Sequence, residues 1–163
     1  MDTKKIVLAI DSFKGSASSY AIGEYVKEGI AKIVPNANFS IVPIADGGEG
    51  TVEAIVTARK GTYNKVKVQG PLGADTIATY GMIDGNTAIL EMAAASGITL
   101  VPKSELNPLK ASTYGTGQMV LDAISKGAKD VYMGIGGSAT NDGGAGMIQA
   151  LGGKLLKEDG TPI

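Results

Sequence analysis

The sequence contains no cysteine, no histidine and no tryptophan among its 163 residues. Without cysteine there are no disulfides and no thiol nucleophiles, and without histidine there is no Ser-His-Asp triad. The two absences together exclude a Cys/His zinc site. A general base would have to be Asp, Glu, Lys or Tyr. This inventory favours chemistry in which the protein mainly positions groups and neutralises charge, of which phosphoryl transfer is an example.

Strong net charge and long apolar runs are also missing. The net charge is -1, the isoelectric point is about 5.4 and no basic stripe is visible, so nucleic acid is not an expected partner. No apolar run approaches the roughly 20 residues of a membrane span, so no membrane association is expected. The apolar run 6–10 follows two lysines but is too short for a signal peptide, which predicts a cytoplasmic protein.

What is present is an alternation of strand and helix patterns. Strands are predicted at 5–10, 39–44, 63–68, 76–83, 87–92, 130–135 and 154–157, and helices at 19–33, 51–59, 115–126 and 144–151, with "MAAASG" as a candidate short helix. This order is typical of an α/β fold. The runs 5–10 and 130–135 are nearly all apolar, which predicts parallel strands buried on both faces. A β-rich segment begins near residue 61 and marks a candidate domain boundary.

Three loops rich in small residues each follow a predicted strand: "DSFKGS" at 11–16, "ADGGEG" at 45–50 and "GGSATNDGGAG" at 136–146. In open α/β sheets, ligands bind outside the carboxyl ends of the strands, where helix N-termini attract anions. The stretch 134–146 holds six glycines, so something must approach its backbone closely. The sequence therefore suggests a cradle for an anion such as phosphate.

Each loop also has a structural interpretation. Ser16 and Ser18 could cap a helix and Lys14 could be solvated, while Asp46 and Glu49 would be favoured at a helix start by the helix dipole. Glu91, in an apolar strand, is either solvent-facing or a functional acid. "TYGTG" at 113–117 is either a further ligand contact or a helix start. No loop matches the Walker A pattern or the dinucleotide fingerprint, so a nicotinamide site is not supported.

Together the motifs closely resemble those of bacterial glycerate kinases. They are "IDSFKGS", "PIADGGEGTVEA", "GPLG", "AILEMAAASG", "STYGTG" and "GIGGSATNDGGAGMIQALG", in the order found in that family. The resemblance implies ATP-dependent phosphorylation of D-glycerate, usually to 2-phosphoglycerate, with 3-phosphoglycerate as the alternative. It also implies a two-domain α/β fold with the active site in the cleft between the domains. One domain is flavodoxin-like and inserted, and the other is discontinuous.

Family members are longer, so the chain resembles their N-terminal portion. Residues 1–60 would form the N-terminal half of the discontinuous domain, and residues 61–163 the start of the inserted domain. On this basis the chain alone is expected to be inactive, and to self-associate or to recruit a missing C-terminal half.

Site residues and cofactors also follow from the resemblance. It implies catalytic roles for Lys14, Asp46 and Asp142, with ATP and Mg²⁺ as cofactors. Asp46 or Asp142 would orient the acceptor hydroxyl or hold Mg²⁺, and no dedicated metal cage is expected, because phosphate and water bind most of the metal. The expected substrate- or phosphate-binding residues are Ser12, Ser16, Gly47, Gly48, Glu49, Gly136, Gly137, Ser138, Thr140 and Asn141.

Two other functions remain open from the residues alone. The loops could belong to a non-catalytic module that binds a phosphate or a nucleotide. They could also belong to another enzyme on a similar sheet, such as a sugar-phosphate isomerase. A glycerate-dependent release of ADP would distinguish the kinase from both.

Overall fold

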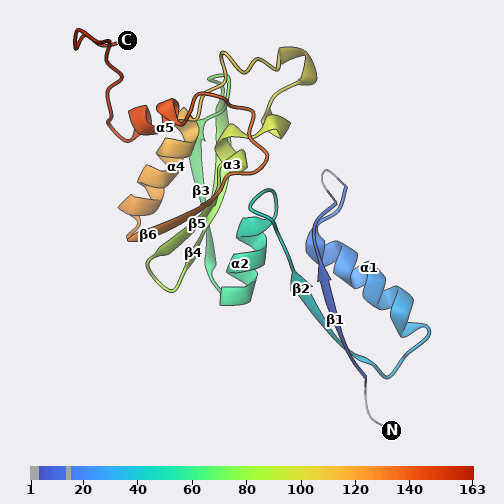
Figure 1. Ribbon diagram of the computed structural model, residues 1–163. Helices are drawn as coiled ribbons and strands as arrows, with labels where there is room; N and C mark the ends of the chain where they lie inside the picture. Colours follow the sequence, from blue (N-terminus) through green and yellow to red (C-terminus); the bar gives the residue numbers. More distant parts are fainter. Residues whose placement is uncertain (1–3, 14–15) are drawn as a thin grey trace.

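The chain folds as an α/β protein with two separate sheets (Figure 1). The structure, a computed structural model, describes residues 4–13 and 16–163. The first sheet pairs β1 (Lys5–Ile10) with β2 (Asn38–Pro43) in parallel, and α1 (Ser19–Ala31) connects and covers the two strands. Ser18 caps α1 by accepting a hydrogen bond from the N–H of Ala21, which explains why the helix begins there.

The second sheet has four strands in the order β3-β4-β5-β6. They are β3 (Thr62–Gln69), β4 (Asp75–Ile83), β5 (Thr87–Glu91) and β6 (Asp130–Gly134). The first three pair antiparallel, and β6 pairs parallel with β5. Asp84 and Gly85 both have positive φ at the β4–β5 turn, so the hairpin predicted from "DGN" is confirmed.

Helices cover both faces of this second sheet. On one side lies α2 (Thr51–Arg59), which also contacts β2 and so lies between the two sheets. On the other side lie α3 (Ala93–Ser96) and α4 (Tyr114–Ser125), with α5 (Ala145–Ala150) packed on α4. Two short 3-10 turns, η1 (Ile98–Leu100) and η2 (Lys103–Glu105), connect α3 to α4. None of the helices in the described part of the chain is long and apolar enough to cross a membrane.

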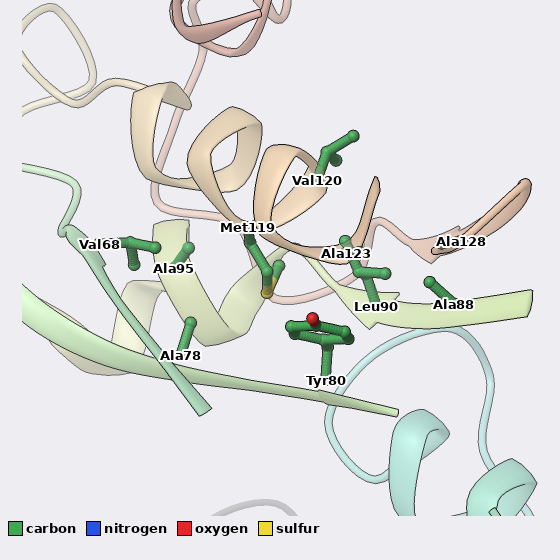
Figure 2. Close-up of a cluster of buried hydrophobic side chains, with 10 residues drawn as sticks. All are labelled: Val68, Ala78, Tyr80, Ala88, Leu90, Ala95, Met119, Val120, Ala123 and Ala128. Atoms are coloured by element: carbon green, nitrogen blue, oxygen red, sulfur yellow. The ribbon is translucent and has the colours of Figure 1, made fainter. Parts of the chain in front are cut away.

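Successive residues of β5 contribute to two hydrophobic clusters, one on each face of the second sheet. Ala88 and Leu90 face α4 and join Tyr80 and Met119 in the larger cluster shown in Figure 2. Ile89, between them in sequence, belongs to a smaller cluster under α2. Successive residues of a strand point to opposite faces, so a short apolar run supplies both cores.

The predicted order of strands and helices is confirmed, apart from the last strand. Residues 154–157 form no strand in the structure. Instead the chain turns back on itself, with a single bridge between Leu156 and Pro162 and a hydrogen bond from the N–H of Lys157 to the carbonyl of Thr161. A β pattern becomes a strand only where a neighbour offers a ladder of hydrogen bonds, and within residues 4–13 and 16–163 this segment pairs with neither sheet.

The predicted burial of two strands on both faces is wrong. In β1 only Leu8 is buried, because α1 covers one face and Val7 on the other remains 63% exposed. β6 is an edge strand, and its first three residues, Asp130 to Tyr132, are exposed. The change from the first sheet to the second falls between α2 and β3, next to the predicted boundary at residue 61, while the division into two domains stays a prediction.

Candidate functional site

The three predicted loops follow the carboxyl ends of β1, β2 and β6, as the strand order requires. The structure brings two of them into direct contact. The N–H of Gly136 donates a hydrogen bond of 2.9 Å to the carbonyl of Gly47, so the 45–50 loop crosses the start of the 136–146 loop.

This crossing accounts for part of the glycine content. A Cβ on Gly134 would lie 2.4 Å from the carbonyl oxygen of Gly47, and a Cβ on Gly136 would lie 2.8 Å from Cα of Gly48. Neither distance leaves room for a side chain. At these two positions, what approaches the backbone closely is the protein's own 45–50 loop rather than a ligand.

Glu91 fixes the same loop from β5. Its carboxylate accepts a 2.7 Å hydrogen bond from the N–H of Val52, in the first turn of α2. Burial raises the pKa of the Glu91 carboxyl, and the charge of Glu49 adds to the rise, although backbone N–H groups at the helix start partly oppose it. Of the two interpretations left open by the sequence, the solvent-facing one is wrong, because Glu91 is half-buried and its carboxylate caps a helix from another part of the chain.

Asp142 organises the 136–146 loop in a similar way. Its Oδ2 accepts hydrogen bonds from the N–H and Oγ1 of Thr113 and from the N–H of Gly146, and its Oδ1 accepts one from the N–H of Gly144. Partial burial by itself would raise the pKa of Asp142, but these bonds outweigh it and hold the pKa below its ordinary value. The carboxylate therefore ties the loop to the start of α4.

The first two loops share a cavity of about 270 Å³, which we call the serine cavity. Its lining residues are Ser12, Phe13, Ser16, Ala17, Ser18, Ser19, Glu49, Gly50 and Glu53. Three of the predicted site residues, Ser12, Ser16 and Glu49, thus meet here. Lys14 lies outside the described residues.

The third loop opens on a different hollow of about 510 Å³, which we call the methionine hollow. It is lined by Met92, Thr113, Thr116, Met133, Ile135, Ser138, Thr140, Asn141, Asp142, Gly143, Gly144 and Met147. Ser138, Thr140, Asn141 and Asp142 were predicted from sequence. The three methionines and Ile135 were missed, because each lies in or beside a regular element, where an apolar residue is typical of a core.

The remaining predicted residues that the structure describes are in the lining of neither hollow. Asp46 is exposed, and its Oδ1 accepts a hydrogen bond of 3.2 Å from the N–H of Gly48. Gly47 and Gly48 form the crossing with Gly136, and Gly137 follows it. Within residues 4–13 and 16–163, no three acidic side chains gather closely enough to hold a metal ion by themselves.

Comparisons with known proteins agree on one family. The profile of the glycerate kinase family matches residues 6–163. A glycerate kinase from Halalkalibacterium halodurans is 54% identical over 159 residues, which is 97% of this chain and 42% of that protein. Glycerate 2-kinase from Escherichia coli K12 is 49% identical over 98% of this chain and 42% of its own length.

A solved structure shows the same relationship. The crystal structure of a protein from Salmonella typhimurium LT2, provisionally described as glycerate kinase 2, superposes with a TM-score of 0.82 at 47% identity. It is matched over 99% of this chain and 44% of its own chain. The chain thus spans less than half the length of these relatives. With a family profile that covers nearly all of it and relatives at this level of identity, the chain belongs to the glycerate kinase family.

Proposed function

We propose that this chain takes part in the ATP-dependent phosphorylation of D-glycerate to 2-phosphoglycerate. The observation that carries the proposal is the family match over residues 6–163, together with the identity to a relative named glycerate 2-kinase. The site is consistent with it, because loops from both sheets meet at the carboxyl ends of their strands, where α/β proteins bind ligands.

In this proposal Asp46, rather than Asp142, is the carboxylate that acts on the acceptor. Asp46 is exposed and accepts one described hydrogen bond, whereas Asp142 already accepts four from its own loop and from Thr113. The hydroxyl oxygen of glycerate attacks the γ-phosphorus of ATP and passes its proton to Asp46. The bond from the γ-phosphorus to the bridging oxygen breaks, and ADP leaves.

The serine cavity is the proposed place for glycerate. The hydroxyls of Ser12 and Ser16 can donate to and accept from the two hydroxyls of a small hydroxy acid. Because Glu49 and Glu53 also line this cavity, the glycerate carboxylate requires a cation nearby, and Lys14 is the one that the adjacent sequence offers.

Mg²⁺ fits the same region, because a hard cation prefers oxygen ligands and the exposed carboxylate of Glu49 belongs to the same loop as Asp46. When bound, it would neutralise charge on the transferred phosphate. The protein's own share is to hold that loop in place, through Glu91 and the Gly47–Gly136 crossing.

We also propose a cytoplasmic location and a further polypeptide as partner, either the segment that relatives have beyond the match or a second copy. The uncovered face of the first sheet supports a partner, since Val7 and Val42 are 63% and 47% exposed there.

The test is a coupled assay for ADP with ATP and D-glycerate. It uses the chain alone and the chain joined to the additional segment of a full-length relative. Glycerate-dependent ADP release by the joined protein supports the kinase. ATP or glycerate binding with no turnover would favour the binding module, and conversion of a sugar phosphate without ATP would favour the isomerase.

A further inference from the structure

The methionine hollow differs in chemistry from what the sequence suggests for its loop. Its apolar side consists of Met92, Met133, Met147 and Ile135, which come from the ends of β5 and β6 and from α5. Its polar side consists of hydroxyl and amide side chains and the carboxylate of Asp142, and none of its described lining residues is Lys or Arg. Such a surface is suited to an uncharged ligand with an apolar ring.

Several N–H groups of the loop that lines the hollow already donate hydrogen bonds within the protein. The N–H of Ala139 donates to the carbonyl of Ser96, and the N–H of Thr140 donates to Oγ of Ser138. The N–H groups of Gly144 and Gly146 both donate to Asp142. These four donors are occupied within the protein, and α5 has only six residues, so the start of that helix does not offer an anion site by itself.

Among the described residues of the lining, the one ionisable side chain is Asp142, and both of its oxygens accept hydrogen bonds from the protein. A negative group placed beside it would be repelled rather than bound. The amide of Asn141 is exposed at the rim, and an amide can both donate to and accept from the edge of a heterocyclic base.

We propose that the methionine hollow binds the purine base and ribose of ATP and that the triphosphate lies outside it. Thioethers are polarisable and adaptable, and they make favourable contacts with aromatic rings. The volume of about 510 Å³ lies within the range of roughly 300–1,000 Å³ for small-molecule sites. The inference rests on the proposed kinase function for the identity of the nucleotide, and it assigns the nucleoside and glycerate to different hollows.

The methyl groups of the methionines can report ligand binding to the hollow by NMR. Three of the six methionines line the hollow. Met119 is fully buried in the core, and Met82 lies on β4 beside Gly61 and Asp84, so both serve as internal controls. NMR spectra of the 163-residue chain with isotope-labelled methionine methyl groups would be recorded during titration with adenosine, up to its solubility limit, and separately with D-glycerate.

Adenosine is expected to shift the methyl signals of Met92, Met133 and Met147 while those of Met82 and Met119 stay in place. D-Glycerate alone is expected to move none of the three. The proposal is overturned if adenosine leaves all three unmoved, if it shifts the control methyls equally, or if glycerate shifts the three as adenosine does.

A pair of variants tests the location independently of the methionine signals. Ile135→Glu places a carboxylate on the hollow at a position that is already 74% exposed, and should weaken adenosine binding roughly tenfold, because an apolar ring would cover a charge. Ile124→Glu makes the same change near the far end of α4, at a residue 50% exposed, and should leave binding unchanged. Equal effects of the two variants would contradict the assignment.

The test of the nucleoside site and the test of the proposed kinase function can be told apart by their results. Methyl shifts with adenosine, but no glycerate-dependent ADP release from the joined protein, would support the nucleoside site and reject the kinase. Glycerate-dependent ADP release without methyl shifts would support the kinase and reject the nucleoside site.

Discussion

The carboxylate of Glu91, at the end of β5, accepts a 2.7 Å hydrogen bond from the N–H of Val52 in the first turn of α2. This contact connects the second sheet to the helix that follows the 45–50 loop. Together with the Gly47–Gly136 crossing, it holds Asp46 and Glu49 at the edge where both sheets end.

Glu91→Gln should change how stability depends on pH. The pKa of Glu91 is raised by burial from 4.5, so the stability linked to its protonation is fully present below that value and is lost as pH rises through the raised pKa. Glutamine does not titrate and its oxygen can still accept from Val52. The free energy of unfolding of the variant, relative to the parent chain, should therefore rise with pH above 4.5 in urea titrations.

Glu91→Ala is the matched control, because it removes the acceptor at every pH. It should lower the free energy of unfolding by about 1–3 kcal/mol, the usual cost of a partly buried N–H left without a partner. If Glu91→Gln shows the same pH profile as the parent chain, Glu91 does not titrate with a raised pKa.

Gly136→Ala should destabilise the protein by about 1–3 kcal/mol, because its Cβ would lie 2.8 Å from Cα of Gly48 and the two loops would have to separate. Gly29→Ala is the control. Gly29 lies in α1 with open space around it, so alanine there should stabilise by about 0.5–1 kcal/mol. Thermal and urea unfolding of both variants measure the difference, and equal stability of Gly136→Ala and the parent would refute the close crossing.

Asp142→Asn should cost stability, whereas Asp46→Asn should cost turnover. The amide nitrogen that replaces Oδ2 in Asp142→Asn cannot accept the bonds that this oxygen takes from Thr113 and Gly146, which predicts a loss of about 1–3 kcal/mol. Asp46 is exposed and its one described bond survives in asparagine, so the free energy of unfolding of Asp46→Asn should be nearly unchanged.

Acid titration and kinetics separate the two carboxylates further. The pKa of Asp142 is lowered from 3.8. The stability that its ionised carboxylate contributes is therefore present above that value and is lost as pH falls through the lowered pKa. The parent chain should show this acid loss and Asp142→Asn should not. The matching substitution for Asp46 in a full-length relative should lower kcat, and an unchanged kcat would remove Asp46 from the proposed chemistry.

Tyr80 should be the last of the six tyrosines to ionise. Its side chain is fully buried and its hydroxyl donates a 2.8 Å hydrogen bond to Asp122, so burial first, and then this bond, raise its pKa far above 10.0. The stability linked to this proton is fully present below pH 10.0 and is lost as pH rises through the raised pKa.

Phenolate absorbance during alkaline titration should therefore show one tyrosine that ionises only as the chain unfolds. In Tyr80→Phe this late step should disappear, and the free energy of unfolding near neutral pH should fall by about 0.5–1.5 kcal/mol. A late step that persists in Tyr80→Phe would assign it to another tyrosine.

The order of elements was predictable because its signals are local. Periodic apolar residues, the cap at Ser18 and the turn at Asp84-Gly85 act within a few neighbouring residues, and α2 has the predicted bounds. The sequence also predicted that the three loops rich in small residues would follow strand ends, and they follow β1, β2 and β6.

Tertiary structure decided whatever depends on partners distant in the chain. The apolar composition of 5–10 specifies a strand but not what covers it, so Val7 lies exposed. Gly134 and Gly136 appeared to be ligand contacts because their neighbour, the 45–50 loop, is remote in sequence. The role of Glu91 could not be assigned from its own segment. Its partner is the first turn of α2, and the strands β3 and β4 separate that helix from β5 in the chain. Hydrogen bonds and close packing at these positions depend on residues that are neighbours in space but distant in the chain. Those neighbours cannot be identified from a single sequence.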